Sequence, residues 1–285
     1  KEVFRTPIEK GGDSERLNQL RQRVRPFMLR RHKSDVAKDL PPKVESIASV
    51  ELQDEQADLY ETIRLSTEMS VREALRSKGL AKSQIQILDA LLKLRQVCCD
   101  PRLVSLDAAR NVKQSAKLEL LMDLLPEMLS EGRKVLLFSQ FTSMLALIED
   151  ELRARDIPWV KLTGQSQHRD ALVNKFTSGQ VPLFLISLKA GGVGLNLPQA
   201  DTVIHYDPWW NPAVENQATD RAHRIGQTQQ VMVYKLVAQG TIEERILALQ
   251  ERKSELANSM YEGSASRKEA MFSETDVAEL LKPLG

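Results

Sequence analysis

Hydrophobic runs and amphipathic segments alternate along the second half of the chain. Five short apolar runs predict strands, at residues 134–139, 159–163, 182–187, 201–206 and 230–236. Segments with apolar residues at helical spacing predict helices between and after them, at 115–129, 143–155, 167–177, 213–223 and from Thr241 onward. Strands that are apolar throughout are typical of a parallel sheet covered by helices on both faces. The pattern therefore predicts an α/β fold for this half.

The first half of the chain has a mainly helical pattern. Its expected elements are a helix at 13–40 that breaks at Pro26, a linker at 40–43, a strand at 44–52 and two or three amphipathic helices within 54–99. Pro101 ends this helical block, and residues 105–114 have a loop-like composition. After residue 260 the tail is polar at first and then predicts one short helix.

Composition and charge exclude some classes of protein. With 285 residues and 42% hydrophobic content, the chain can bury a substantial core. The formal net charge of +1 does not indicate a polyanionic partner, although seven Arg or Lys residues and no acid lie between Arg16 and Lys33. Cys98 and Cys99 are adjacent and form no C-x-x-C pair for zinc, which favours a reducing, intracellular setting. There is no signal peptide and no apolar run of about 18 residues to span a membrane. The chain begins without Met, so we expect it to be part of a longer protein.

Polar and glycine residues follow four of the predicted strands. These segments are SQFT (139–142), TGQS (163–166), SLKAGGVGLNL (187–197) and DPWWNP (207–212). The carboxyl ends of parallel strands meet at one edge of a sheet, and ligands of doubly wound sheets bind there. The sequence therefore predicts a site at this edge.

The glycine-rich segment at 187–197 has the composition of an anion-binding loop. Gly191, Gly192 and Gly194 permit positive φ and close backbone approach, so that exposed N–H groups can surround an anion. Ser187 and Lys189 can add contacts to phosphate oxygens. The alternative is a flexible turn between a strand and a helix. The spacing of the glycines is not that of the G-x-G-x-x-G dinucleotide fingerprint.

Two consecutive tryptophans, Trp209 and Trp210, lie between prolines in DPWWNP. Consecutive side chains of an extended backbone point in opposite directions, so both cannot be core. We therefore expect one ring to be exposed or to lie in an interface.

A cluster of polar residues on the predicted helix 213–223 and just after it faces one direction. Gln217, Asp220, Arg221 and Arg224 fall within one narrow arc. One interpretation is a solvated face in which Asp220 pairs with Arg224. The other is a catalytic role, because arginine suits the stabilisation of charge on a transferred phosphoryl group and this helix follows a strand that ends beside the glycine loop.

Other candidate motifs are excluded or have simpler explanations. DEQAD (54–58) resembles a helicase acidic box but opens an amphipathic helix, so Asp54 and Glu55 are expected to act as cap and first-turn acids. No G-x-x-x-x-G-K-[ST] phosphate loop occurs. His205, on an apolar strand, is expected to be a core residue with its hydrogen bond satisfied.

Several of these segments, in order, resemble motifs of the Swi/Snf-type DNA-dependent ATPases of helicase superfamily two. KVLLFSQFT resembles motif IV, LISLKAGGVGLNL resembles motif V, and ADTVIHYDPWWNPAVENQATDRAHRIGQ resembles motif Va running into motif VI. LTGQSQHR, VYKLVAQGTIEERI and, upstream, FMLRRHKSDVAKDLPPKVE, LQDEQADLY and LRQVCCDP also follow the family. CCDP departs from the more usual Cys-Asn-His-Pro, and SLKAGG has Ser-Leu where Ser/Thr-Thr is common.

The resemblance implies a RecA-like parallel sheet with helices on both faces, forming the second helicase lobe, and a helical protrusion. The domains it implies are a basic helical segment and inter-lobe linker at 1–51, the protrusion at 52–114, the RecA-like C-terminal lobe at 115–260 and a tail with a short helix at 261–285. The compact protrusion is more similar to those of bacterial members.

The resemblance also implies roles for individual residues. Arg221 and Arg224 correspond to arginine fingers that reach the γ-phosphate of ATP, and Trp209 and Trp210 to residues that couple DNA contact to ATP turnover. Further nucleotide-site positions are Gly192, Gly194, Asn196, Gln217 and Asp220. The positions expected to hold the DNA backbone are Ser139, Gln140, Thr163, Gly164, Arg169, Ser187 and Lys189.

The implied activity is that of an ATP-dependent translocase on double-stranded DNA, which displaces or remodels DNA-bound proteins. ATP and Mg²⁺ are expected to be held mainly by an N-terminal RecA-like lobe, the other partner of this chain, so the chain alone is expected to be inactive. A bacterial protein is expected in the cytoplasm at the nucleoid and a eukaryotic one in the nucleus. Two alternatives stay open: a lobe of a strand-separating DNA or RNA helicase, and a non-catalytic interaction module.

Overall fold

The computed structural model describes Glu15 and residues 39–190, 194–261 and 273–285. The predicted helix at 13–40, with its basic run, lies outside the described residues apart from Glu15 and the last two positions. Gly191 and Gly192 of the glycine loop are also outside them.

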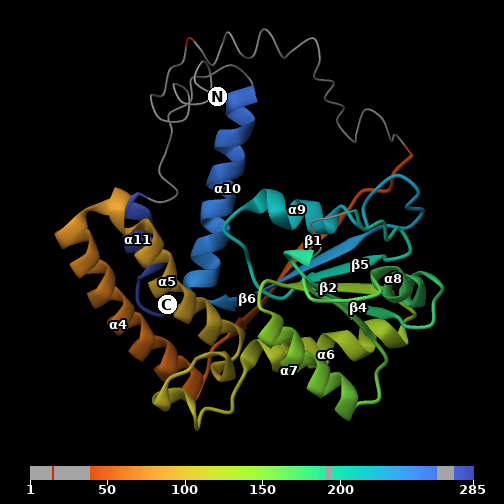
Figure 1. The fold of residues 1–285 in the computed structure, drawn as a ribbon, viewed down its shortest axis with the longest axis horizontal. Helices are drawn as coiled ribbons and strands as arrows, with labels where there is room; N and C mark the ends of the chain where they lie inside the picture. Colours follow the sequence, from red (N-terminus) through yellow and green to blue (C-terminus); the bar gives the residue numbers. More distant parts are fainter. Residues whose placement is uncertain (1–14, 16–38, 191–193, 262–272) are drawn as a thin grey trace.

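Six parallel strands form one sheet in the order β1-β6-β5-β2-β4-β3 (Figure 1). The strands are β1 (Val44–Glu51), β2 (Val135–Ser139), β3 (Val160–Leu162), β4 (Leu183–Ser187), β5 (Thr202–His205) and β6 (Met232–Gln239). Every residue of β2, β4 and β5 is buried, as expected for strands covered on both faces. The predicted α/β fold with a parallel sheet is therefore confirmed. β1 extends this sheet, because it pairs along the whole length of β6.

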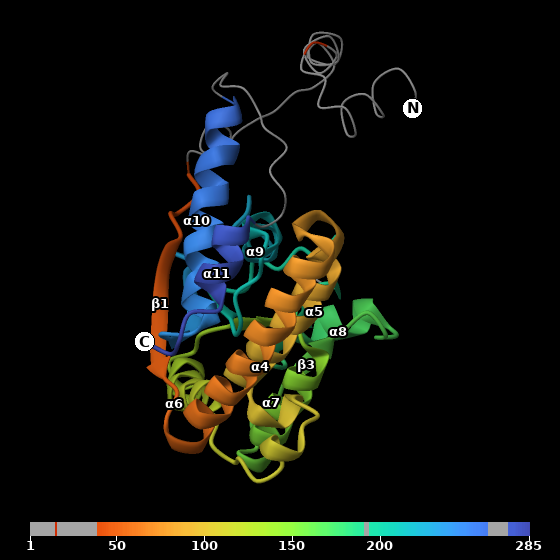
Figure 2. The ribbon, with the colours of Figure 1, turned by 90° about the vertical axis from the view of Figure 1, so that its left-hand side faces the viewer.

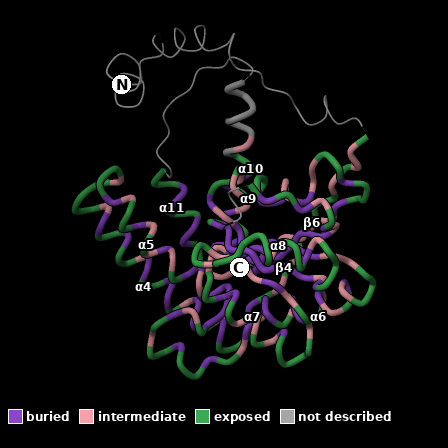
Figure 3. The backbone as a smooth tube through the Cα atoms, turned by 45° about the vertical axis from the view of Figure 1, so that its right-hand side comes forward, coloured by how far each residue is buried: buried purple, intermediate pink, exposed green. Residues whose placement is uncertain are grey.

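Helices cover both faces of the sheet. α6 (Ala116–Ser130) and α7 (Thr142–Ala154) pack on one face, and α8 (Arg169–Thr177) and α9 (Pro212–Thr219) on the other. Alternate residues of β2 point to the two layers: Leu137 joins the core under α6 and α7, and Phe138 joins the core under α8 and α9. The strands accordingly form the buried centre of this half (Figure 3).

A helical unit lies beside the sheet (Figures 1 and 2). It contains α4 (Asp54–Lys78), α5 (Leu80–Cys99), α10 (Ile242–Tyr261) and α11 (Glu274–Leu280), and the 3₁₀ turns η2 (Pro101–Leu103) and η3 (Asp107–Ala109) connect α5 to α6. Buried apolar residues of α4, α5, α10 and α11 form one core cluster. The chain end fastens this unit, since Arg64 of α4 donates to the Leu281 carbonyl over 3.1 Å and Leu284 N donates to Glu61 over 2.8 Å.

Two local expectations are corrected by the structure. Asp54 and Glu55 are first-turn acids, as expected, but the N-cap of α4 is Gln53 and its side chain makes no capping bond. The helix predicted at 213–223 ends at Thr219. Beyond it the chain forms turns with bonds between residues two to four apart, and the Arg221 carbonyl accepts a hydrogen bond from Leu197 N over 3.0 Å rather than continuing the helix.

Candidate functional site

The strand ends predicted to form a site meet at one edge of the sheet. Ser139 and Ser187 are direct partners in the register of β2 and β4. Leu162 pairs with Ile186, so Thr163 lies beside Ser187 at the same edge. Phe138 pairs with His205, which brings the segment after β5 next to the segment after β2. The four polar segments are therefore neighbours.

The glycine loop and the arginine segment are joined at Leu195. Arg221 and Arg224 each direct an Nη1 towards the Leu195 carbonyl, at 3.4 Å and 3.2 Å. Gly194, on one side of Leu195, has φ +68°, which a side chain would strain, and among the described residues, its chain neighbours aside, no atom lies within 4 Å of where its Cβ would be. Asn196, on the other side, is exposed. Two guanidinium groups thus converge on Leu195, next to a glycine with positive φ.

The other residues predicted near the nucleotide lie on or just after α9. Gln217 is exposed, whereas Asp220, Arg221 and Arg224 are half-buried. His223 interacts with the Pro41 carbonyl over 2.8 Å. The predicted linker at 40–43 therefore contacts the segment that carries Arg221 and Arg224.

The residues predicted to contact DNA divide into two groups by exposure. Gly164, Arg169 and Lys189 are exposed, and Thr163 and Gln140 are half-buried. The turn after β3 is held by side chains, because Thr163 N donates to the Ser166 hydroxyl over 2.8 Å.

Ser139 and Ser187, which were also predicted to contact DNA, differ from these residues because both are buried. Ser139 is 0% exposed and its hydroxyl donates to Asp207 Oδ1 over 2.5 Å, and Ser187 is 4% exposed and accepts from Ala190 N over 3.3 Å. Neither hydroxyl is at the surface where a phosphate can reach it. Their hydrogen bonds stabilise the segments at this edge from within the fold. The exposed residues are the ones available to a ligand.

The tryptophans occupy different environments and neither is exposed, so the expectation that both cannot be core is corrected. Trp210 is 5% exposed and joins the core of the helical unit, whereas Trp209 is half-buried and packs against the core under α8 and α9. Glu215 holds this segment by accepting from Trp209 N over 3.0 Å, and Gln250 of α10 donates to both the Trp209 carbonyl and Glu215. The segment thus connects the two cores.

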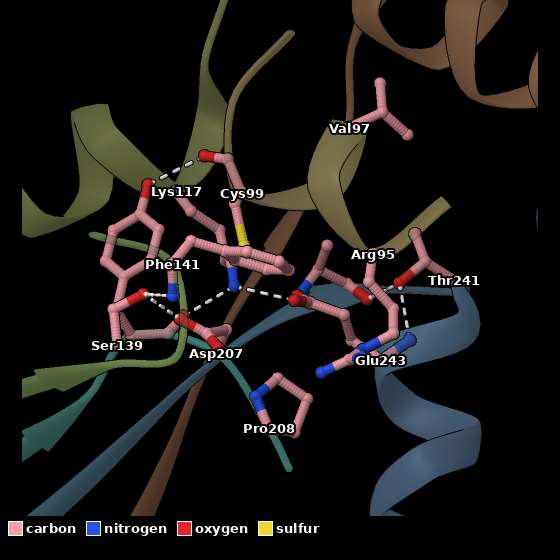
Figure 4. A network of polar contacts seen from close by, with 12 residues as sticks. Arg95, Val97, Cys99, Lys117, Ser139, Phe141, Asp207, Pro208, Thr241 and Glu243 are labelled. Carbon is pink, nitrogen blue, oxygen red and sulfur yellow. Dashed lines mark hydrogen bonds and ion pairs between the residues drawn. The ribbon is translucent and has the colours of Figure 1, made fainter. Parts of the chain in front are cut away.

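A buried polar network lies behind this edge (Figure 4). Lys117, 0% exposed, donates to the Tyr206 carbonyl over 2.5 Å and to Glu243 over 2.8 Å. Burial lowers the pKa of Lys117, but the facing Glu243 carboxylate, together with Cys99 and Asp207, raises that pKa above its usual value. Asp207 accepts from Ser139 and, over 3.3 Å, from Gln140 N. The backbone just before the tryptophans is therefore fixed from two sides.

Sequence reasoning missed four charged members of this region: Arg95, Lys117, Asp207 and Glu243. One feature of the sequence could have indicated Lys117 and Arg95: each is a cation on the mainly apolar face of its predicted helix, the face expected to be buried. Their partners lie far away in the chain, so no short motif indicates the pairing.

His205 is a core residue, as expected, but its hydrogen bonding is not fully satisfied, because its buried Nδ1 has no partner within the described residues. Its Nε2 lies 2.9 Å from the Thr219 hydroxyl, and its ring stacks on Phe138 with 5.6 Å between centroids. Burial, with smaller contributions from Lys235 and Lys43, lowers the pKa of His205 to about 3. The imidazole is therefore neutral in the folded chain.

Residues 39–190, 194–261 and 273–285 contain neither a cluster suited to a metal ion nor a helix suited to span a membrane. In these residues no three His, Cys, Asp or Glu side chains are grouped so as to hold a metal ion. None of the described helices is long and apolar enough to cross a membrane.

Comparisons with known families match both halves of the chain. The helicase conserved C-terminal domain matches residues 116–226, and the SNF2-related domain matches residues 1–103. An uncharacterized ATP-dependent helicase of Mycoplasma genitalium is 39% identical over 90% of this chain, and the chromatin structure-remodeling complex subunit snf21 of Schizosaccharomyces pombe is 34% identical over 90%. The chain spans about a quarter of the length of these two relatives, 24% and 23%.

Solved structures match in fold and in sequence. The C-terminal domain of the Sulfolobus solfataricus SWI2/SNF2 ATPase is 31% identical with a TM-score of 0.65, over 85% of this chain and 99% of that one. The ATPase core of the same protein in complex with double-stranded DNA is 33% identical with a TM-score of 0.66, over 98% of this chain and 59% of that one.

Proposed function

Because the chain belongs to the SWI2/SNF2 family of ATPases, as a C-terminal helicase lobe, we propose that it is the second lobe of an ATP-dependent translocase on double-stranded DNA. Its work is to remodel or displace DNA-bound proteins. The observation that carries the proposal is the convergence of Arg221 and Arg224 on the glycine loop at the carboxyl edge of the sheet. In this proposal the edge carries both a nucleotide-responsive group and a nucleic-acid surface.

In this proposal Arg221 and Arg224 are arginine fingers for ATP bound on another lobe. Guanidinium groups stay charged at all relevant pH values and match phosphate oxygens in geometry. The Leu195 carbonyl holds their donors in place before a nucleotide arrives. Gly192, Gly194, Asn196, Gln217 and Asp220 are proposed to complete this side of the nucleotide site.

The proposal assigns the triphosphate and Mg²⁺ to an N-terminal RecA-like lobe. The printed sequence has no phosphate loop, and the described residues include no cluster that can hold a metal ion. Mg²⁺ held by that lobe would supply neutralisation of the phosphate charge. The domain division at 1–51, 52–114, 115–260 and 261–285 is part of the proposal, with β1 of the first segment completing the sheet edge.

Double-stranded DNA is proposed to lie along the exposed end of β3 and β4. Gly164, Arg169 and Lys189 are exposed there, with Thr163 and Gln140 beside them. Hydroxyls, backbone N–H groups and cations are the usual donors to DNA phosphates. Trp209 and Trp210 lie between this surface and α10 and are proposed to couple DNA contact to ATP turnover.

The finger role is tested in the enzyme that carries both lobes. Arg224→Ala or Arg221→Ala should lower kcat roughly 10³-fold or more while changing ATP affinity only slightly, since a finger acts mainly in the transition state. Arg155→Ala is the matched control, because Arg155 ends α7 and pairs with Glu151 away from the edge. Turnover within severalfold of the unsubstituted enzyme would refute the finger role.

Stimulation of ATP turnover by different nucleic acids tests the substrate. Duplex DNA should stimulate more than single-stranded DNA or RNA, and the isolated chain should show only background hydrolysis. Preferential stimulation by RNA or by single strands favours the strand-separating alternative. Hydrolysis by the chain alone contradicts its role as half of a site.

A further inference from the structure

Arg95 extends from the helical unit into the segments at the carboxyl edge of the sheet. It lies on α5 and is 6% exposed. Its Cζ is 5.0 Å from the ring centroid of Trp210, 5.3 Å from that of Trp209 and 5.7 Å from that of Phe141. All three distances lie within the range of cation–π attraction. Phe141 follows β2 and the tryptophans follow β5, so one side chain contacts the segments after two neighbouring strands.

The polar contacts of Arg95 lead to the same segments. Its Nη2 donates to Gln140 Oε1. Gln140 in turn donates through its backbone N to Asp207 over 3.3 Å and through Nε2 to the Pro208 carbonyl over 3.5 Å. Asp207 and Pro208 immediately precede the tryptophans. Arg95, Phe141, Asp207 and Pro208 lie together in one network (Figure 4).

Stability alone explains Arg95 poorly. Burial lowers the pKa of its guanidinium, with the Asp207 carboxylate opposing that shift most. Its Nε is buried and has no hydrogen-bond partner within the described residues. A desolvated charge with an incomplete set of hydrogen bonds is costly, and an apolar side chain would fill the same space at lower cost. A planar cation supplies instead a defined orientation for the rings that face it.

We propose that Arg95 is a positioning residue, through which the helical protrusion sets the conformation of Trp209 and Trp210 and thereby the extent to which DNA stimulates ATP turnover. The inference rests on the proposed function, because it concerns the coupling segment of that function. Arg95 touches neither nucleotide nor DNA in this arrangement and acts through Gln140 and the aromatic rings.

The first test observes the tryptophans in the chain itself. Trp159→Phe removes the third tryptophan, so that the emission comes only from Trp209 and Trp210. In this background Arg95→Met should shift the emission maximum and increase quenching by acrylamide, and Arg95→Lys should do so less. Arg64→Met is the matched control, because Arg64 is a 5% exposed arginine of the same helical unit that bonds to Glu61, Glu68 and the Leu281 carbonyl. It should leave the emission unchanged.

The second test measures ATP turnover of the two-lobe enzyme with and without duplex DNA. Arg95→Met should reduce the ratio of DNA-stimulated to basal turnover roughly tenfold, the size expected of cation–π contacts in a desolvated site, with basal turnover within about twofold. Arg95→Lys should restore part of the ratio, since it keeps the charge but not the planar group. It also serves as the test if Arg95→Met fails to fold, as judged by circular dichroism. Arg64→Met should keep the ratio of the unsubstituted enzyme.

The outcomes separate the inference from the proposed function. If the unsubstituted enzyme shows no stimulation by DNA, the proposed function fails. If it is stimulated and both Arg95 variants keep the full ratio, only the inference is overturned. An equal reduction of basal and stimulated turnover, together with an unchanged tryptophan emission, assigns Arg95 a structural role and also overturns it.

Discussion

Two groups of polar residues lie at the same edge of the sheet, and they differ in where their partners are. One group is buried and makes its hydrogen bonds within the lobe, His205 to the Thr219 hydroxyl and the others to one another or to the backbone; this group is Lys117, Ser139, His205, Asp207 and Glu243. The other group faces solvent beyond β3 and β4; this group is Gly164, Arg169 and Lys189. Bonds made inside the lobe fix its geometry. Side chains exposed at the edge are available to a ligand, so substitutions in the first group should act on stability and those in the second on binding.

The largest expected effect comes from the buried ion pair. Lys117→Met leaves the Glu243 carboxylate buried without its cation, which should lower the free energy of unfolding by about 3–5 kcal/mol. The Tyr206 carbonyl also loses a donor. Urea unfolding of the chain, followed by circular dichroism, measures the loss.

A double-mutant cycle sharpens this prediction. Lys117→Met combined with Glu243→Leu removes both charges, and apolar side chains of similar volume should recover much of the stability. Additive losses would mean that the two residues act independently, which contradicts the pairing that defines the buried group.

The next effect is a pH dependence that comes from His205. Its pKa is lowered to about 3 in the folded chain and is near 6.5 in the unfolded chain. As the pH falls below 6.5, His205 becomes protonated in the unfolded chain but stays neutral in the folded chain. The stability that comes from the neutral His205 is therefore present above this pH and is lost below it. The loss from His205 between pH 7 and pH 5 should be about 2 kcal/mol.

His205→Gln is the control for this dependence. Glutamine can keep a hydrogen bond to the Thr219 hydroxyl but does not titrate. The variant should be less stable at pH 7, yet its stability should fall less between pH 7 and pH 5. If the free energy of unfolding has the same pH slope in both proteins, His205 takes up a proton in the folded state. It could then not be counted among the buried residues.

The difference between the two groups also explains what the sequence could predict. The strands were predicted within a few residues, because apolar runs between polar segments are a local signal. The end of α9 was not, because it depends on the bond between Leu197 and Arg221, which lie in different segments. Lys117 and Glu243 lie 126 residues apart and Arg95 and Gln140 lie 45 apart, so a linear pattern contains neither contact. The exposed residues were predicted from motifs, and the partners proposed for them, DNA and nucleotide, lie outside the chain.

The smallest expected effect tests the exposed group. Lys189→Ala removes one cation from the edge, so duplex DNA should bind about two- to fivefold more weakly and the slope of log affinity against log salt should fall by about 1. Fluorescence anisotropy of a labelled duplex at several salt concentrations measures both quantities. Lys175→Ala is the matched control: Lys175 is equally an exposed lysine but lies near the end of α8, where its carbonyl bonds to Val181 N just before β4 begins. Equal losses of DNA affinity in both variants would mean that binding depends on positive charge anywhere on the lobe. The carboxyl edge would then not be the DNA-binding surface.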